Sequence, residues 1–168
     1  MKKAVPLSAL LFVFLFSFTQ SSKHIREVFH ESVKSESKLQ SLIASKDYPN
    51  TDVTNAYKGL AKCTSADFAT WPTTKWTYFK EGKALIEAAV KASPANPEIA
   101  YVRFMVQANA PALVDYSDEI EHDISVFQNN IQKYNVSDTW KQKFIKQMAA
   151  SVNLTAAQKT RIKNTPIN

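Results

Sequence analysis

From Ile25 onward the apolar residues recur every three or four positions, with charged and polar residues between them. This spacing places the apolar side chains on one face of an α-helix, whereas a half-buried strand would alternate apolar and polar residues. The clearest series is Ile120, Ile124, Phe127 and Ile131. The pattern predicts an all-α protein of about six to seven helices, stacked as antiparallel hairpins.

Prolines and polar clusters divide this pattern into segments. Pro94 and Pro97 end one helix and precede the next, because proline cannot continue a helix and restricts the residue before it. The predicted helices cover about residues 25–46, 52–63, 74–92, 98–108, 118–134, 138–152 and 156–165. The expected N-terminal caps are Thr51 or Asp52, Ser117, Ser137, and Thr155 with Gln158 in a capping box.

Composition supports a packed helical domain. Hydrophobic residues make up 45% of the chain and charged residues 21%, which is typical of a globular protein. The chain has only 2 glycines, and hairpin turns of a sheet protein would need more. The single Cys63 cannot form an internal disulfide and is interpreted as a small core residue, with a reactive or pairing thiol as the alternative.

The N-terminal segment resembles a cleavable signal peptide over residues 1–20. Lys2 and Lys3 precede an apolar stretch, Leu7 to Phe18, that is too short to span a bilayer. Cleavage is expected before Gln20 or after Ser21, and no cysteine follows for lipid attachment. We therefore expect a single helical domain over residues 23–165, periplasmic or secreted, not a lipoprotein and not inserted in the membrane. A retained N-terminal anchor is the alternative.

One stretch has small, large and small residues at a regular spacing before a proline, followed by a turn and the start of the next helix. Its residues are Gly82, Ile86, Ala89, Pro94, Asn96, Pro97, Glu98 and Tyr101. This spacing resembles the second helix of a tetratricopeptide repeat and the turn after it. Arg103 and Phe104 depart from the pattern, and the loops after Cys63 and Pro111 are longer than in that family.

A second set of residues is spread over roughly half of the chain after the leader. It consists of Tyr57, Lys58, Gly59, Asn96, Pro97, Glu98, Tyr101, Arg103, Phe104, Gln107, Asn109, Pro111 and Tyr116. This set resembles short exported helical proteins of Bacteroidetes-type bacteria. The resemblance implies a location in a Gram-negative cell envelope and implies no activity.

Arg103 is the most informative polar residue, since it lies on an otherwise apolar helix. It is predicted to pair with Glu121 or Asp123 and to fix the angle of a helical hairpin. The alternative is a guanidinium that binds the carboxylate of a ligand. The candidate partner-binding or structural residues are Arg103, Gln107, Asn109, Tyr116 and Trp71.

Two further groups of residues have a functional and a structural interpretation. Trp71 and Trp76 flank a loop-to-helix junction, where Trp71 is the indole expected to be exposed and Trp76 fits the apolar stripe. The acidic residues near His122 are interpreted as favourable charges at a helix N-terminus capped by Ser117, and no metal or other cofactor is predicted. This acidic cluster consists of Asp115, Asp118, Glu119, Glu121 and Asp123.

Positive charge is concentrated near the C-terminus. The formal net charge is +6, and loss of Lys2 and Lys3 with the leader lowers it to +4. A solvated helix face is the favoured interpretation, with contact to anionic lipid headgroups or an acidic partner as the alternative, and no nucleic acid is expected. The basic residues are Lys133, Lys141, Lys143, Lys146, Lys159, Arg161 and Lys163.

These observations favour a protein–protein interaction module over an enzyme. No serine lies in a glycine-flanked elbow, and no catalytic residues are assigned. The alternative is a carrier of a lipid or hydrophobic small molecule, and a small hydrolase is the third hypothesis.

Overall fold

The computed structural model describes residues 25–167, and the predicted leader, residues 1–20, lies outside them. The described residues contain no strand, and they begin with a helix over residues 25–32. The all-α prediction is confirmed. The remaining elements are α2 (Glu36–Ala44), α3 (Asp52–Ser65), α4 (Pro72–Ala92), α5 (Pro97–Gln107), the 3-10 helix η1 (Ala112–Val114), α6 (Ile120–Asn130), α7 (Asp138–Ala150) and α8 (Ala156–Lys163).

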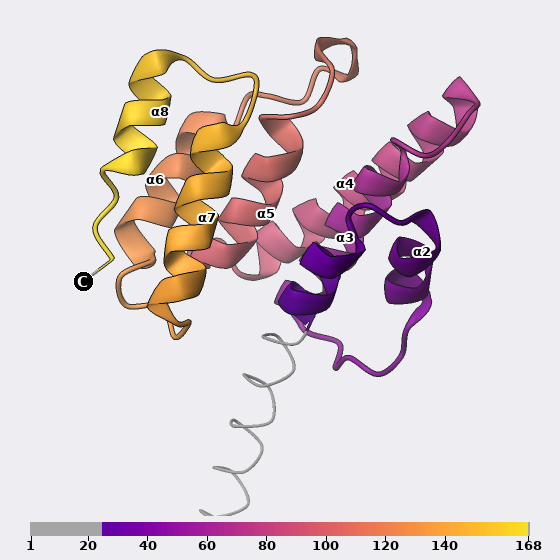
Figure 1. Cartoon of the computed structure of the whole chain (residues 1–168), viewed down its shortest axis with the longest axis horizontal. Coiled ribbons are helices and arrows are strands. Elements are labelled where there is room, and N and C mark those ends of the chain that lie inside the picture. The colour runs from indigo at the N-terminus through magenta and orange to yellow at the C-terminus, as the bar shows by residue number, and fades with distance from the viewer. Residues whose placement is uncertain (1–24, 168) are drawn as a thin grey trace, which may run out of the picture.

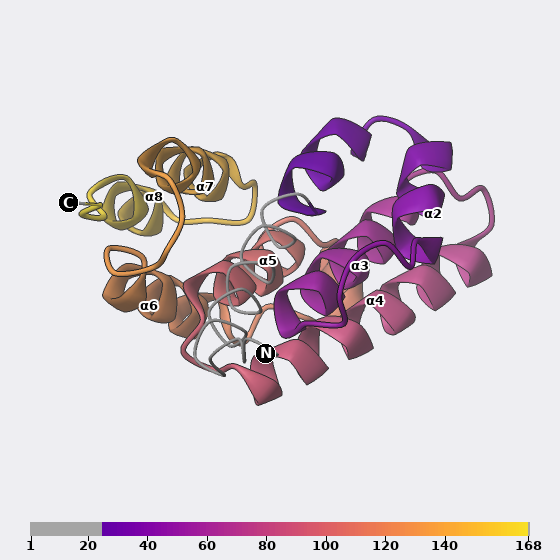
Figure 2. The same cartoon turned by 90° about the horizontal axis from the view of Figure 1, so that it is seen from below.

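Helix α5 lies in the middle of the structure. The N-terminal helix, α2, α3 and α4 pack to one side of it, and α6, α7 and α8 pack to the other (Figures 1 and 2). Every residue of α5 except Met105 is buried. A helix that is apolar around most of its circumference is buried by neighbours on all sides, which is what the sequence predicts for this segment.

The chain's two glycines, Gly59 on α3 and Gly82 on α4, lie where these helices cross. A Cβ atom at Gly59 would lie 2.7 Å from the carbonyl oxygen of Gly82, and one at Gly82 would lie 2.5 Å from that of Gly59. Both distances are shorter than a van der Waals contact. The close approach of α3 and α4 therefore depends on the absence of a side chain at both positions.

The three predicted hairpins are present as neighbouring helix pairs: α3 with α4, α5 with α6, and α7 with α8. Their N-terminal caps are also largely as predicted. Thr51 accepts from the backbone N–H of Thr54, and Ser137 accepts from that of Trp140. Thr155 forms the complete capping box of α8. A tetratricopeptide-like arrangement of these hairpins stays a prediction.

Two predicted helix boundaries are wrong. The first predicted helix, residues 25–46, is interrupted by a turn after Ser32, and α2 begins only at Glu36. Serines are weak helix formers because their hydroxyls compete for backbone groups, and the Ser32 hydroxyl bonds to the Val28 carbonyl at 2.6 Å. The fifth predicted helix ends at Asn130, so that Tyr134 lies in the turn beyond it.

The cap predicted for α6 is wrong as well. Ser117 does not cap this helix, because Glu119 occupies the N-cap position. The Glu119 backbone N–H instead donates to Gln107 Oε1 at 3.0 Å. Before α6, η1 is followed by Asp115, which adopts a left-handed conformation with φ of 45°. The sequence pattern predicts only a break between the helices at this point.

Within residues 25–167, none of the helices is both long enough and apolar enough to cross a lipid bilayer.

Candidate functional site

An apolar groove opens where the end of α3, the start of α4, the end of α5 and η1 meet. Its volume is about 450 Å³, which lies within the range of about 300–1,000 Å³ that is common for ligand sites. We call it the α3–α5 groove. Its apolar lining includes Leu60, Cys63, Trp76, Phe79, Met105, Val106, Leu113 and Val114, and its polar lining includes Thr64, Asp67, Lys75 and Asn109.

Large hydrophobic side chains are exposed around this groove. Leu113 is 95% exposed, and Trp76 is 50% exposed. On the loop before α4, Trp71 is 71% exposed and Phe68 is 37% exposed. Within the described residues, Val152 is the one other large hydrophobic side chain with such exposure. The apolar surface is therefore concentrated at the groove, whose α4 and η1 walls project from the same side of the molecule (Figure 1).

The prediction that Trp76 is part of the buried stripe of α4 is wrong. The indole stacks on Phe79, with ring centroids 5.8 Å apart, and half of the side chain is exposed to solvent. Only Phe79, Gly82, Ile86 and Ala89 are buried on this long helix. The first two turns of α4 extend beyond the rest of the core, so the periodic position of Trp76 does not bury it.

Cys63 lies in the wall of the α3–α5 groove. Its side chain is half-buried, and burial raises the pKa of the thiol to about 12. The Sγ atom lies 3.8 Å from the carbonyl oxygen of Phe79. At neutral pH this group is a neutral thiol that contributes apolar surface, not a nucleophilic thiolate.

Behind the groove, Arg103 on α5 forms a buried ion pair with Asp123 on α6. Its Nη2 donates to Asp123 Oδ1 at 2.7 Å, and its Nε lies 3.0 Å from both carboxylate oxygens. Gln107 Nε2 donates to Asp123 Oδ2 at 2.9 Å. Arg103 thus pairs with Asp123 and joins α5 to α6, as one of the two predicted pairings requires. Glu121, the other predicted partner, pairs with Arg161 instead.

The Arg103 network reaches solvent at one edge. Glu87 Oε2 lies 3.4 Å from Arg103 Nη1, and Glu119 Oε2 lies 3.6 Å from Nη2. The Glu87 and Glu119 side chains are 39% and 51% exposed. Burial raises the pKa of Asp123 to about 6, although its bonds to Arg103 act in the opposite direction.

Tyr116 connects this network to the groove. Its hydroxyl donates to Glu87 Oε1, and its ring meets Phe79 edge-to-face with centroids 5.8 Å apart. Burial, followed by the hydrogen bond to Glu87, raises the pKa of Tyr116. Because Phe79 lines the groove, the ion-pair network supports one groove wall from behind.

A second buried network, which the sequence pattern does not predict, surrounds Glu98 at the start of α5. Arg26 donates from Nε and Nη2 to the two carboxylate oxygens, each at 2.5 Å. The hydroxyls of Tyr57 and Tyr134 each donate to the same carboxylate at 2.9 Å. Burial acts to lower the pKa of Arg26, but its bonds to Glu98 raise it overall. Glutamate is common in the first turn of a helix for electrostatic reasons. The sequence therefore gives no sign that Glu98 is the centre of a buried network.

The structure brings some of the candidate site residues together and separates others. Arg103, Gln107 and Tyr116 belong to one network, which is structural in its contacts. Asn109 lines the α3–α5 groove, where its side-chain amide bonds to Met105 O at 2.8 Å and to Ser151 Oγ at 3.0 Å. Trp71 lies on the loop beside the groove, at the N-cap of α4.

The acidic cluster does not converge on a common point. Asp123 faces Arg103 inside the protein, whereas Glu121 pairs with Arg161 and accepts from Gln158 Nε2. In residues 25–167 no three His, Cys, Asp or Glu side chains are grouped as metal ligands.

Comparison with other proteins gives no family assignment. No family model, no curated protein and no solved structure matches the chain.

Proposed function

We propose that this protein is an interaction module that binds a segment of a partner protein in the α3–α5 groove. The observation that carries the proposal is the concentration of exposed Trp71, Trp76 and Leu113 around one apolar groove of about 450 Å³. Large apolar patches of this kind on a protein surface mark binding sites, and aromatic side chains dominate the binding energy of interfaces.

The charged residues at the groove indicate which charges the partner segment carries. Asp67 and Lys75 both line the groove, and neither forms a salt bridge within the described residues. A complementary segment has adjacent apolar side chains that fill the groove and carries one basic and one acidic residue beside them. The apolar anchors supply affinity, and the two charges set the orientation.

A carrier of a hydrophobic small molecule is the second candidate. It is favoured by the groove volume and by the largely apolar lining. The exposure of Leu113 and Trp76 argues for a protein partner, since a carrier shields its ligand and the groove's own walls from water.

The test is a selection of peptides on the full chain, from a displayed library with apolar centres and charged flanks. Affinity is then measured for the wild type and for Leu113→Asp, with Ala157→Asp on the exposed face of α8 as the matched control. We expect Leu113→Asp to weaken binding by about tenfold or more, since burying an unpaired carboxylate in the interface is unfavourable. The control variant should bind as the wild type does.

Two results would contradict the proposal. One is selected peptides that bind both variants equally, because they would then lie outside the groove. The other is native mass spectrometry in which the purified protein retains an apolar small molecule that Leu113→Asp no longer holds, which would favour the carrier.

A further inference from the structure

A second surface, separate from the α3–α5 groove, lies over α7, α8 and the residues after α8. It contains a shallow depression of about 550 Å³. Its apolar lining comes from Ile145 and Ala149 on α7 and from Ile167 near the C-terminus, and Lys146 and Lys163 lie beside them. An aliphatic floor between two cations is thus formed by parts of the chain that only the tertiary structure brings together.

The lysines of this surface have no acidic partners within the described residues. Lys146, Lys159 and Lys163 form no salt bridge there, whereas Lys141 pairs with Asp138 and Arg161 pairs with Glu121. Lys141 is 6% exposed and bonds to the backbone carbonyls of Gln132 and Ile167, so its inclusion in a solvated basic face is wrong. We call Lys146, Lys159 and Lys163 the basic face.

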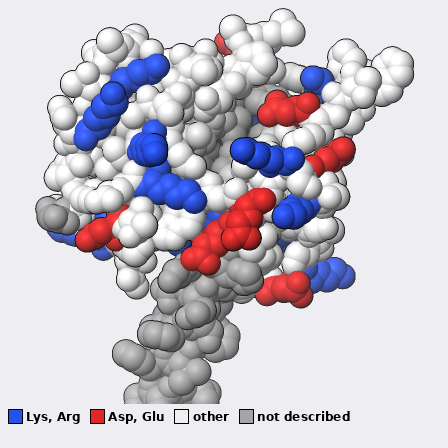
Figure 3. Space-filling model, viewed as in Figure 1, with Lys and Arg blue, Asp and Glu red and all other residues white. Residues whose placement is uncertain are grey.

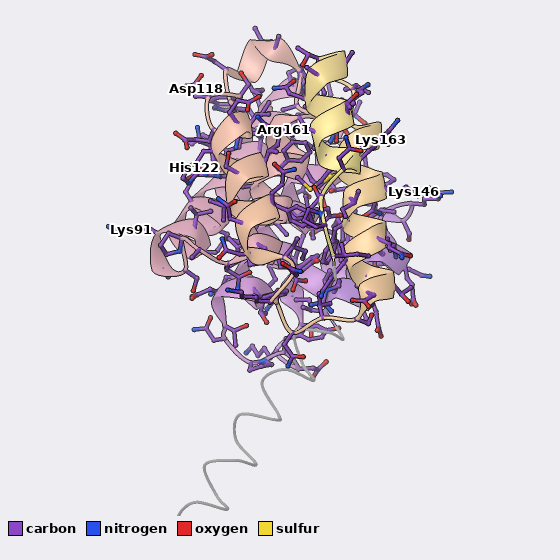
Figure 4. The ribbon with its side chains drawn as sticks, turned by 90° about the vertical axis from the view of Figure 1, so that its left-hand side faces the viewer. Lys91, Asp118, His122, Lys146, Arg161 and Lys163 are labelled. Atoms are coloured by element: carbon purple, nitrogen blue, oxygen red, sulfur yellow. The ribbon has the colours of Figure 1, made fainter. Side chains whose placement is uncertain are left out.

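The arrangement of charge around the basic face is one-sided. Figure 4 shows Lys146 and Lys163 extending toward the same side of the molecule, away from Asp118 and His122 near α6. In Figure 3 the blue side chains over α7 and α8 have no red side chain between them. Lys159 lies one turn before Lys163 on α8 and so shares its helix face.

We propose that the basic face binds the surface of a membrane containing anionic phospholipid. The occupant must be negatively charged, because Lys146 and Lys163 line the depression without acidic partners and Lys159 shares the helix face of Lys163. It must also be apolar beside the charge, because the floor between Lys146 and Lys163 is aliphatic. A phospholipid headgroup with its adjoining acyl region has both properties. Nucleic acid would instead favour aromatic side chains for base stacking, and none lines this depression.

The test uses the protein as purified from the expressing cells and vesicles of phosphatidylcholine with an equal part of phosphatidylglycerol. Binding is measured by co-sedimentation for the wild type, for Lys146→Gln with Lys163→Gln, and for Lys38→Gln with Lys91→Gln. Lys38 and Lys91 are exposed on α2 and α4, so the second pair is a control with the same change in net charge. All variants share one N-terminus, and its contribution cancels in the comparison.

We expect the first pair to lower the vesicle partition coefficient by about tenfold, and the control pair to have a much smaller effect. Reductive methylation of lysines, read by mass spectrometry, gives a local measurement. Anionic vesicles should protect Lys146, Lys159 and Lys163 but leave Lys38 and Lys91 reactive, and vesicles of phosphatidylcholine alone should protect none of them.

A separate variant tests the apolar floor. Ile167→Ser keeps the backbone carbonyl that Lys141 contacts and removes aliphatic surface. It should reduce the binding that remains at high salt, where the attraction between charges is screened. Equal losses for the two lysine pairs, uniform protection of all lysines, or tighter binding to a single-stranded oligonucleotide than to the vesicles would each overturn the proposal.

Discussion

Helix α5 contributes one residue to each of two buried arginine–carboxylate pairs, and the two pairs differ in their further hydrogen-bond partners and in their exposure to water. Glu98 accepts two hydrogen bonds from one edge of the Arg26 guanidinium and one from each of two tyrosine hydroxyls, and the pair is 3% and 0% exposed. Arg103 shares its charge among Asp123, Glu87 and Glu119, and the last two are partly exposed. The first network is closed, whereas the second is open to water along one edge.

The closed network joins more of the chain than the open one. Arg26 comes from the N-terminal helix and Tyr57 from α3, while Tyr134 follows α6. The Arg26 guanidinium also lies over the Trp140 ring of α7, 5.4 Å from its centroid. One carboxylate therefore joins both groups of helices that flank α5, whereas the Arg103–Asp123 pair joins α5 to α6 alone. Glu98 therefore stabilises the packing of the whole helical domain, whereas Arg103 stabilises the region behind the α3–α5 groove.

The largest effect is expected from Glu98→Ala, because it leaves the Arg26 charge buried without its partner. We expect a loss of about 3–5 kcal/mol in the free energy of unfolding, measured by urea denaturation at pH 7. Glu81→Ala is the control, since its pair with Lys62 is half-exposed and should change the stability by less than about 1 kcal/mol. Equal losses in the two variants would mean that the closed network has no special role.

Arg103→Ala should have a smaller effect, about 2–3 kcal/mol at pH 7. Water can reach the open edge, and the buried Asp123 can take up a proton once its partner is lost. The same variant should therefore lose less stability at pH 5 than at pH 7. Arg161→Ala, which removes an exposed pair with Glu121, should have almost no effect. A loss at pH 5 as large as that at pH 7 would contradict the open-network interpretation.

The smallest effect is a difference in pH dependence between the two networks. Beside the closed network, His30 stacks on Trp140, its Nε2 is buried without a hydrogen-bond partner in the described residues, and burial lowers its pKa to about 4. As the pH is lowered, His30 is therefore protonated at a higher pH in the unfolded chain than in the folded protein. The contribution of His30 to the free energy of unfolding falls as the pH drops from about 6.5 toward 4. Asp123 has a raised pKa of about 6, so the folded protein holds its proton more tightly than the unfolded chain does. The contribution of Asp123 to the free energy of unfolding therefore falls as the pH rises from about 4 to 6.

Denaturation at pH 5 and pH 7 distinguishes these two contributions. Relative to His30→Phe, the wild type should lose about 1–2 kcal/mol on going from pH 7 to pH 5. Relative to Asp123→Asn, the wild type should gain stability over the same change. If the relative stability of the wild type changed with the same sign in both comparisons, the pKa values of His30 and Asp123 would not be shifted in opposite directions.

Some contacts of the candidate site follow from sequence and others do not. Arg103 is recognisable because a charged residue on an apolar helix requires a partner, and the acidic residues of the following helix supply one. The groove is not recognisable, because its lining comes from α3, α4, α5 and η1, and η1 has no periodic signal. Trp76 shows the limit of periodicity, which identifies the face of a helix but not where the core ends along it.

The sequence by itself determined the local structure: the helices and most of their caps. These depend on interactions between residues three or four apart, such as Thr155 with Gln158, and so they can be read directly from spacing. Only the tertiary structure decided that Arg26 meets Glu98, 72 positions away, and that the two glycines meet at one helix crossing. These long-range contacts are set by how the helices pack together. Local sequence preferences do not specify which buried charges form a pair or which small residues lie at a helix crossing.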